Sequence, residues 1–303
     1  MPCRRGHVRM RDVFDLFKDT FESWNKDNAQ RLGAALSYYT VFSLGPLLII
    51  MIALVGLIFG RAAVQGMIVN QVQGLVGSQG AQFVQTAIAS AYNPGEGIIA
   101  AVIGVVTLIL GALGIFGELQ GSLNTIWGVQ LKPTAGWRGM IQQRLLSFAM
   151  VLAVGFLLLV SLVASAALSA FSGYLGSFLP MSAAVLQGFY FFFSLVVITI
   201  LFALIFKYLP DAEIAWRNVW VGAAITALLF TVGKYVLGLY LGQSRIISAY
   251  GAAGSVIIIL VWVYYSAQIL FFGAEFTQAF AKRYGKGIVP APNAERIIKE
   301  VHA

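Results

Sequence analysis

The chain has 303 residues, of which 59% are hydrophobic and only 11% are charged. Soluble globular domains carry about 25% charged residues, so this composition excludes an ordinary water-soluble fold and predicts a protein that has lipid as its solvent. A formal net charge of +8 would suit a nucleic-acid partner, but the positions of the basic residues assign the charge to membrane topology instead.

The first 33 residues form a charged segment that we expect in the cytoplasm. Within it, residues 12–27 predict an amphipathic helix. Its apolar stripe consists of Val13, Leu16, Phe17, Thr20, Phe21 and Trp24. Two interpretations fit this stripe: a helix that lies in the membrane interface, or a helix that packs on the inner end of a helical bundle.

Six later stretches are long and apolar enough to span a bilayer, which requires about 20 residues. They are residues 35–60, 97–118, 145–171, 184–206, 218–241 and 253–281. The sequence thus predicts an all-α polytopic fold, with a six-span membrane domain over residues 34–281. Pro46 removes a backbone donor from the first span and should bend it.

The loops between these spans differ strongly in Lys and Arg content. Seventeen of the twenty basic residues fall in the N-terminal segment, the second and fourth loops and the basic tail, residues 282–303. Only Arg61 and Arg245 fall on the opposite side, and Lys234 lies within a span. Because Lys and Arg favour the cytoplasmic side, both termini are expected in the cytoplasm of a bacterial inner membrane.

Residues 62–92, on the predicted outer side, contain no charged residue. Apolar residues follow helical spacing on both sides of Gly77 and Gly80, and glutamines supply a polar face. This pattern predicts an amphipathic helical hairpin that lies on the outer leaflet or dips into it.

Ionisable residues within spans are energetically costly and often functional, which singles out Glu118, Lys234 and Glu275. Lys234 lies in the outer half of its span and Glu275 near the inner end, so we do not expect them to pair; Lys234 should snorkel outward or meet a carbonyl-lined cavity. Gln268 shares a helical face with Glu275 in the last span.

One face of the second span is made of small and polar residues. It comprises Gly104, Thr107, Gly111, Gly114, Glu118, Gly121 and Thr125. Close helix packing explains this face, and so does a polar cavity. A basic ring of Arg31, Arg144, Lys207 and Arg217 at the inner opening would suit an anionic headgroup, although positive-inside topology also accounts for these charges.

Several motifs of this chain resemble the YihY/BrkB family of bacterial inner-membrane proteins. They are Arg31 with GAALSYYTVFSLGP at 33–46, LNTIW at 123–127, YLPD at 208–211, YGAAGS at 250–255, WVYY at 262–265 and GAE at 273–275. The resemblance covers roughly residues 15–285 and implies a six-span protein. Family members have been linked to virulence, serum resistance or export of lipid A precursors. An older ribonuclease label for the family looks like a misassignment. The resemblance therefore implies no catalytic residues for this chain.

The residues argue against an enzyme. The acids are scattered, His7 and His302 lie near the chain ends, and the single cysteine, Cys3, cannot form an internal disulfide, so we expect no metal, no cofactor and no nucleic-acid partner. Two functions remain open. One is a transporter or flippase of an anionic, lipid A precursor-like or other lipid-like amphiphile; the other is a non-transporting envelope scaffold.

Overall fold

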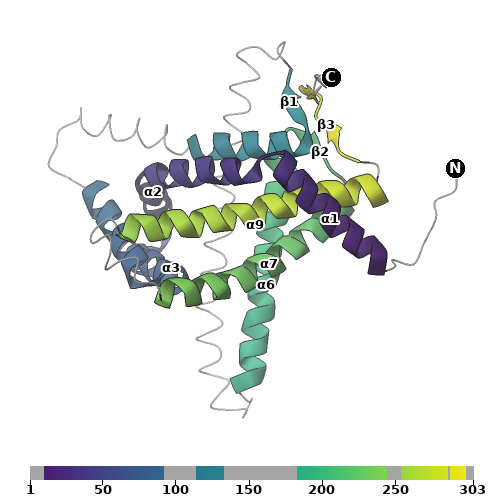
Figure 1. Cartoon of the computed structure of the whole chain (residues 1–303). Helices are drawn as coiled ribbons and strands as arrows, with labels where there is room; N and C mark the ends of the chain where they lie inside the picture. The colour runs from purple at the N-terminus through teal and green to yellow at the C-terminus, as the bar shows by residue number, and fades with distance from the viewer. Residues whose placement is uncertain (1–9, 92–113, 133–182, 244–253, 286, 298–303) are drawn as a thin grey trace, which may run out of the picture.

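The computed structural model describes residues 10–91, 114–132, 183–243, 254–285 and 287–297. These residues form long helices and four short strands (Figure 1). The helices are α1 (Met10–Lys26), α2 (Ala29–Phe59), α3 (Arg61–Ala91), the helical segment 114–127, α6 (Ala183–Tyr208), α7 (Trp216–Gln243) and α9 (Gly254–Tyr284). The strands are β1 (Val129–Leu131), β2 (Ala212–Glu213), β3 (Val289–Pro290) and β4 (Ala294–Arg296).

Three described helices are long and apolar enough to cross a membrane. Their qualifying ranges are Phe191–Tyr208, Trp216–Tyr240 and Gly254–Tyr284, which coincide with the predicted fourth, fifth and sixth spans. The first predicted span falls in α2, which continues through Pro46 as one helix. Most of the second predicted span and all of the third lie outside the described residues. The total of six spans therefore stays a prediction.

Helix α9 is the axis on which the other helices pack. α1, α2, α3 and α7 all contact it, and α6 packs on α7. In Figure 1, α9 runs between α2 and α7, and α1 crosses the C-terminal end of α9. Helix α6 passes behind α7 and runs across the direction of α2 and α9. The described helices therefore do not form a simple parallel bundle.

The contact between α7 and α9 depends on two reciprocal glycine–threonine pairs. A Cβ atom at Gly222 would overlap the Thr277 side chain, and one at Gly273 would overlap Thr226. Each threonine hydroxyl donates to a carbonyl of its own helix, Thr226 to Gly222 and Thr277 to Gly273, both at 2.7 Å. Small residues allow two backbones to approach closely, which is how helices associate where lipid removes the hydrophobic driving force.

Helix α3 contains the break that its glycines predict. Gly77 has a φ of 83°, and two helices meet across a kink there. Val64 from the first half and Val84 and Ile88 from the second are buried together with Ile52 of α2 and Ile259 of α9. The apolar stripes of this hairpin thus pack on the other helices, and its placement on the outer leaflet stays a prediction.

The segments that follow three of the helices are joined by strand pairing, which the all-α prediction did not include. β1 pairs antiparallel with β4, and β2 pairs antiparallel with β3. From the sequence, residues 282–303 are expected to be a basic tail. In the structure, residues 287–297 fold back onto the loops that contain β1 and β2. Strands of two or three residues are too short to show an alternating pattern, which is why the sequence does not reveal them.

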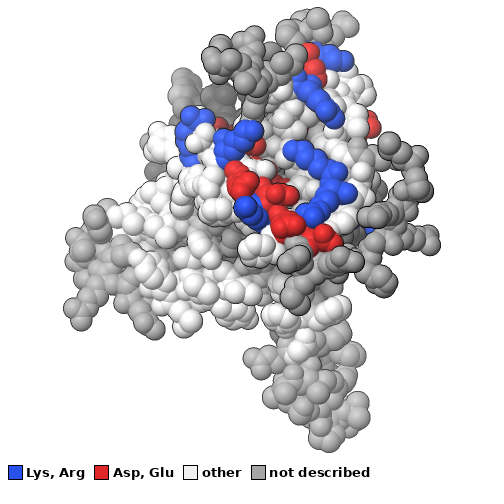
Figure 2. All heavy atoms as spheres, turned by 45° about the vertical axis from the view of Figure 1, so that its right-hand side comes forward, with Lys and Arg blue, Asp and Glu red and all other residues white. Residues whose placement is uncertain are grey.

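These pairings place at one end of the molecule the segments that were predicted to share one side of the membrane. We call residues 120–132, 207–215, 285 and 287–297 the polar cap. Figure 2 shows the Lys, Arg, Asp and Glu residues of one face gathered over this end and α1, with the other described surface in view uncharged. Which side of the membrane the polar cap faces stays a prediction.

The close α7–α9 contact predicts a strong effect of one methyl group. Gly222→Ala forces the helices apart and should lower the free energy of unfolding by about 1–3 kcal/mol, measured by thermal unfolding in detergent. Gly238→Ala is the matched control in the same helix, because a Cβ there meets no described atom within 4 Å. Equal shifts for the two variants would contradict the contact.

Candidate functional site

The predicted site residues that the structure describes do not gather into one cavity. Arg31 and Arg217 are exposed near the starts of α2 and α7, while Glu118 is half-buried in segment 114–127. Gly114, one turn before Glu118, lies against the Tyr39 ring of α2, where an added Cβ would come within 3.5 Å. That end of the small-residue face therefore packs on a helix. Arg144, Gly104, Thr107 and Gly111 lie outside the described residues.

Glu275 lies in the packed interior of the protein. Its exposed fraction is 0%. Its neighbours along α9 bind segment 114–127: Trp127 Nε1 donates to the Ala274 carbonyl at 3.1 Å, and Gln278 Nε2 donates to the Ile126 carbonyl at 2.6 Å. Glu275 is therefore held beside a helix–helix contact, and it lines neither of the two larger pockets described below.

Lys234 and Glu275 lie at different levels of the α7–α9 pair. Gly233 approaches Tyr265 and Ile269, whereas Gly222 approaches Thr277. Six to ten residues of α9 separate this level, next to Lys234, from Glu275, which corresponds to roughly 9–15 Å along the helix. Lys234 Nζ instead lies 5.3 Å from the centre of the Tyr235 ring, a cation–π distance. The two residues are apart, as the sequence predicts.

Two predicted site residues line pockets: Lys234 lines a small one together with Trp262 and Tyr265, and Gln268 lines a larger one. A groove of about 320 Å³ opens between α1, α7 and α9. We call it the apolar groove; it is lined by Phe21, Trp24, Leu229, Val232, Gly233, Tyr265, Gln268, Ile269 and Phe272. Val232 and Phe21 are 55% and 54% exposed, so the groove opens to the surface of the helices.

Two polar atoms at the apolar groove are buried without a hydrogen-bond partner among the described residues. They are the indole Nε1 of Trp24 and the amide oxygen of Gln268. The Gln268 amide nitrogen is engaged, since it donates to the Ala29 carbonyl at 3.3 Å. Buried polar atoms are ordinarily paired, so these two residues of the groove lining keep one donor and one acceptor that no described residue uses.

Helix α1 forms one wall of this groove because it is bound to α9. Phe17 contacts the rings of Phe272 and Phe276, with centroids 6.3 and 5.4 Å away. Arg283, at the end of α9, pairs with three acids of α1, namely Asp12 at 3.2 Å, Asp15 at 3.6 Å and Asp19 at 3.9 Å. Helix α1 therefore packs on another helix, which is one of the two arrangements that its apolar stripe predicts.

Two aromatic residues of α1 remain largely exposed. Phe14 is 72% exposed and Phe21 is 54% exposed in the described structure. Aromatic side chains of this kind partition to the membrane interface, so α1 can pack on α9 and face lipid at the same time.

A buried carboxylate, that of Asp211, joins two segments of the polar cap. Asn124 Nδ2 donates to Asp211 Oδ2 at 2.8 Å, and the Asp211 backbone N–H donates to Asn124 Oδ1 at 2.9 Å. Gln120 Nε2 adds a longer contact of 3.3 Å to the same carboxylate oxygen. Asn124 and Asp211 belong to the LNTIW and YLPD motifs, so both motifs serve one structural contact.

This contact predicts a coupled loss of stability. Asn124→Ala removes one partner from the buried Asp211 and should cost about 1–3 kcal/mol of unfolding free energy. In a double-mutant cycle with Asp211→Ala, the two losses should be less than additive. Gln130→Ala is the control, because its contact with Glu295 is exposed; the interpretation is wrong if the two single losses simply add.

The acids that the structure describes do not form a metal site. No three His, Cys, Asp or Glu residues come close enough to share an ion within the part of the chain that the structure describes. The polar groups in the lining of the apolar groove include the Trp24 indole and the Gln268 amide, which suit a polar organic ligand.

Long apolar helices packed on α9, with charged groups gathered at one end, define a helical membrane protein. A family model described as "Virulence factor BrkB" matches residues 20–298. The chain therefore belongs to the BrkB family, and the resemblance found in its motifs is confirmed.

The three relatives compared below are described as membrane proteins. A "UPF0761 membrane protein" of Verminephrobacter eiseniae is 29% identical, with 84% of this chain and 60% of the relative aligned. A relative of the same description from Methylibium petroleiphilum is 30% identical, with 92% and 65% aligned, and one from Alteromonas mediterranea is 26% identical, with 91% and 90% aligned. The chain thus spans about 60% of the length of the first relative. No solved structure matches it.

Proposed function

We propose that this chain is a bacterial inner-membrane transporter or flippase for an amphipathic, anionic, lipid-like molecule of the cell envelope. The observation that carries the proposal is the apolar groove, which opens beside the charged end of the molecule and holds an unused donor and an unused acceptor. We further propose that the polar cap faces the cytoplasm, since that side of bacterial membrane proteins is enriched in Lys and Arg.

The lining of the apolar groove fits the part of a lipid where chain and headgroup meet. Phe272, Ile269 and Val232 supply an apolar wall for an acyl chain. An ester or amide linkage offers a carbonyl to the Trp24 N–H, and a hydroxyl or amide of the ligand can donate to the Gln268 oxygen. Basic residues at the same end would attract an anionic headgroup.

Filling the apolar groove should slow lipid movement. Val232→Trp places a large ring at its surface-exposed rim, so liposomes that contain this variant should exchange a fluorescent phosphatidylglycerol between leaflets several-fold more slowly than liposomes with the unmodified chain. Dithionite quenching measures the exchange. Val236→Trp is the matched control, because Val236 is similarly exposed on α7 but does not line the groove. Equal rates for both variants, or no exchange by the unmodified chain, would refute the proposal.

The three ionisable residues of the predicted spans are proposed to bind a headgroup or protons during transport. Glu118→Gln, Lys234→Gln and Glu275→Gln should each reduce the exchange rate. Because Glu275 is fully buried, its variant is compared at equal folded fraction by thermal unfolding. Normal rates in the triple variant would remove these residues from the mechanism and leave the groove as the site.

An envelope scaffold is the second candidate function. It is favoured by the packing roles of the described polar residues, such as the Trp127–Ala274 and Asn124–Asp211 contacts. The exposed side of α7, which includes Tyr235, Val236 and Leu239, would then contact a partner rather than lipid. Crosslinking from this side in native membranes should trap a stoichiometric partner if the chain is a scaffold, and lipid if it is a transporter.

A further inference from the structure

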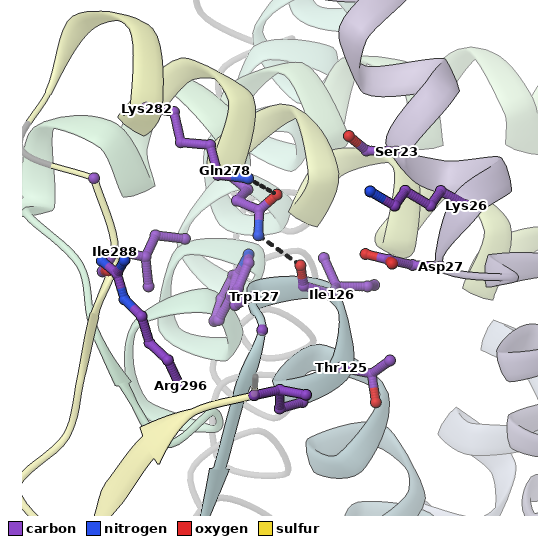
Figure 3. A pocket seen from close by; sticks show the side chains of 13 residues that line it. Ser23, Lys26, Asp27, Thr125, Ile126, Trp127, Gln278, Lys282, Ile288 and Arg296 are labelled. Carbon is purple, nitrogen blue, oxygen red and sulfur yellow. Dashed lines mark hydrogen bonds between the residues drawn. The ribbon is translucent and has the colours of Figure 1, made fainter. Parts of the chain in front are cut away.

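A second pocket lies at the charged end, away from the apolar groove. It has a volume of about 410 Å³ and is formed where the end of α1, residues 125–128, the last turns of α9 and the C-terminal strands meet. Figure 3 shows Lys26 and Asp27 on one side of this space, Lys282 and Gln278 above it, and Arg296 on the opposite side. We call it the basic pocket.

The charges of the basic pocket are unbalanced. Lys26, Lys282 and Arg296 line it, and Asp27 is the acidic side chain among the lining residues that the structure describes. The salt bridges found among the described residues involve none of these three cations. Arg283 gives the contrast, since it lies next to Lys282 in sequence and is matched by three acids of α1.

Two of the three cations, Lys282 and Arg296, are oriented by hydrogen bonds that leave donors unused. Lys282 Nζ donates to Gln278 Oε1 at 2.8 Å, and the same Gln278 is fixed by its bond to the Ile126 carbonyl. Arg296 Nη2 donates to the Ile288 carbonyl at 3.3 Å. An ammonium has three donors and a guanidinium has five, so each side chain keeps donors for a ligand, and the Ser23 hydroxyl lines the same space.

We propose that the basic pocket binds the phosphate group of a phosphorylated small molecule or lipid headgroup. A phosphate oxyanion takes charge-assisted bonds from Arg and Lys, which are roughly twice as strong as neutral ones. The volume falls in the range of small-molecule sites and exceeds what a bare phosphate needs. Ile126, Trp127 and Ile288 line the remaining space and would cover the organic part of the ligand.

Phosphate binding here does not require transport, so it can be tested by binding alone. The full chain is placed in phosphatidylcholine nanodiscs and titrated with glycerol 3-phosphate, with glycerol as the uncharged comparison, in a calorimeter. We expect saturable binding of the phosphate ester and none of glycerol. Lys26→Gln and Arg296→Gln should each weaken binding about tenfold, as expected for loss of one charge-assisted bond.

Lys18→Gln is the matched control for net charge. Lys18 is exposed on α1, outside the basic pocket, where it lies 3.8 Å from Glu22. This variant should bind like the unmodified chain. The Lys26 side chain forms no hydrogen bond or ion pair with the described residues. Its replacement therefore tests binding even if Arg296→Gln proves unstable.

A second arm separates a soluble ligand from a lipid. Nanodiscs that also contain phosphatidic acid are analysed by native mass spectrometry. If the ligand is a lipid headgroup, phosphatidic acid stays bound to the unmodified chain and to Lys18→Gln but is lost from Lys26→Gln, and it competes with glycerol 3-phosphate. Absence of binding in both arms, or equal binding by the Lys18 and Lys26 variants, would overturn the proposal and leave the three cations as determinants of topology only.

Discussion

The arrangement of this protein depends on the buried pairing between Asp211 and Asn124. The Asp211 carboxylate and backbone N–H both bind one asparagine side chain, so the loop after α6 is fixed to the end of segment 114–127. Asp211 is followed directly by β2, and β1 begins at Val129, five residues after Asn124; these strands pair with β3 and β4 of the C-terminal segment. A single satisfied polar contact thus brings three distant parts of the chain together, and an asparagine or aspartate left without its partner there would be costly.

Different forces hold the helices and the polar cap. Among the helices, lipid tails compete equally for apolar surface, so close contacts such as Gly222–Thr277 and Gly273–Thr226 stabilise the packing through shape and dispersion. At the charged end, hydrogen bonds and ion pairs act, including the binding of α1 by Arg283. Both candidate ligand sites adjoin α1, the apolar groove through Phe21 and Trp24 and the basic pocket through Ser23 and Lys26. Helix α1 is therefore the element whose docking would affect both.

Properties that are local in sequence could be predicted, and contacts between distant segments could not. Hydropathy located the helices over residues 184–206, 218–241 and 253–281, and helical spacing located α1. The motifs were sufficient to identify the family. Gln268 was singled out because it shares a helical face with Glu275, and in the structure Gln268 lines the groove whereas Glu275 does not. The pairing of Gly222 with Thr277, the short strands and the basic pocket each depend on residues from two or more segments, and no pattern within one segment reveals them.

The central claim is that α1, residues 128–132, residues 209–215 and the C-terminal strands lie together on the cytoplasmic side. Exposed positions allow a direct test in a Cys3→Ser background, with Lys18→Cys, Gln130→Cys, Glu213→Cys and Asn293→Cys introduced one at a time. A membrane-impermeant maleimide should label all four in inverted membrane vesicles and none in intact spheroplasts. Labelling of any one of them from the outside would contradict the shared location of α1 and the polar cap and the orientation on which the proposed function depends.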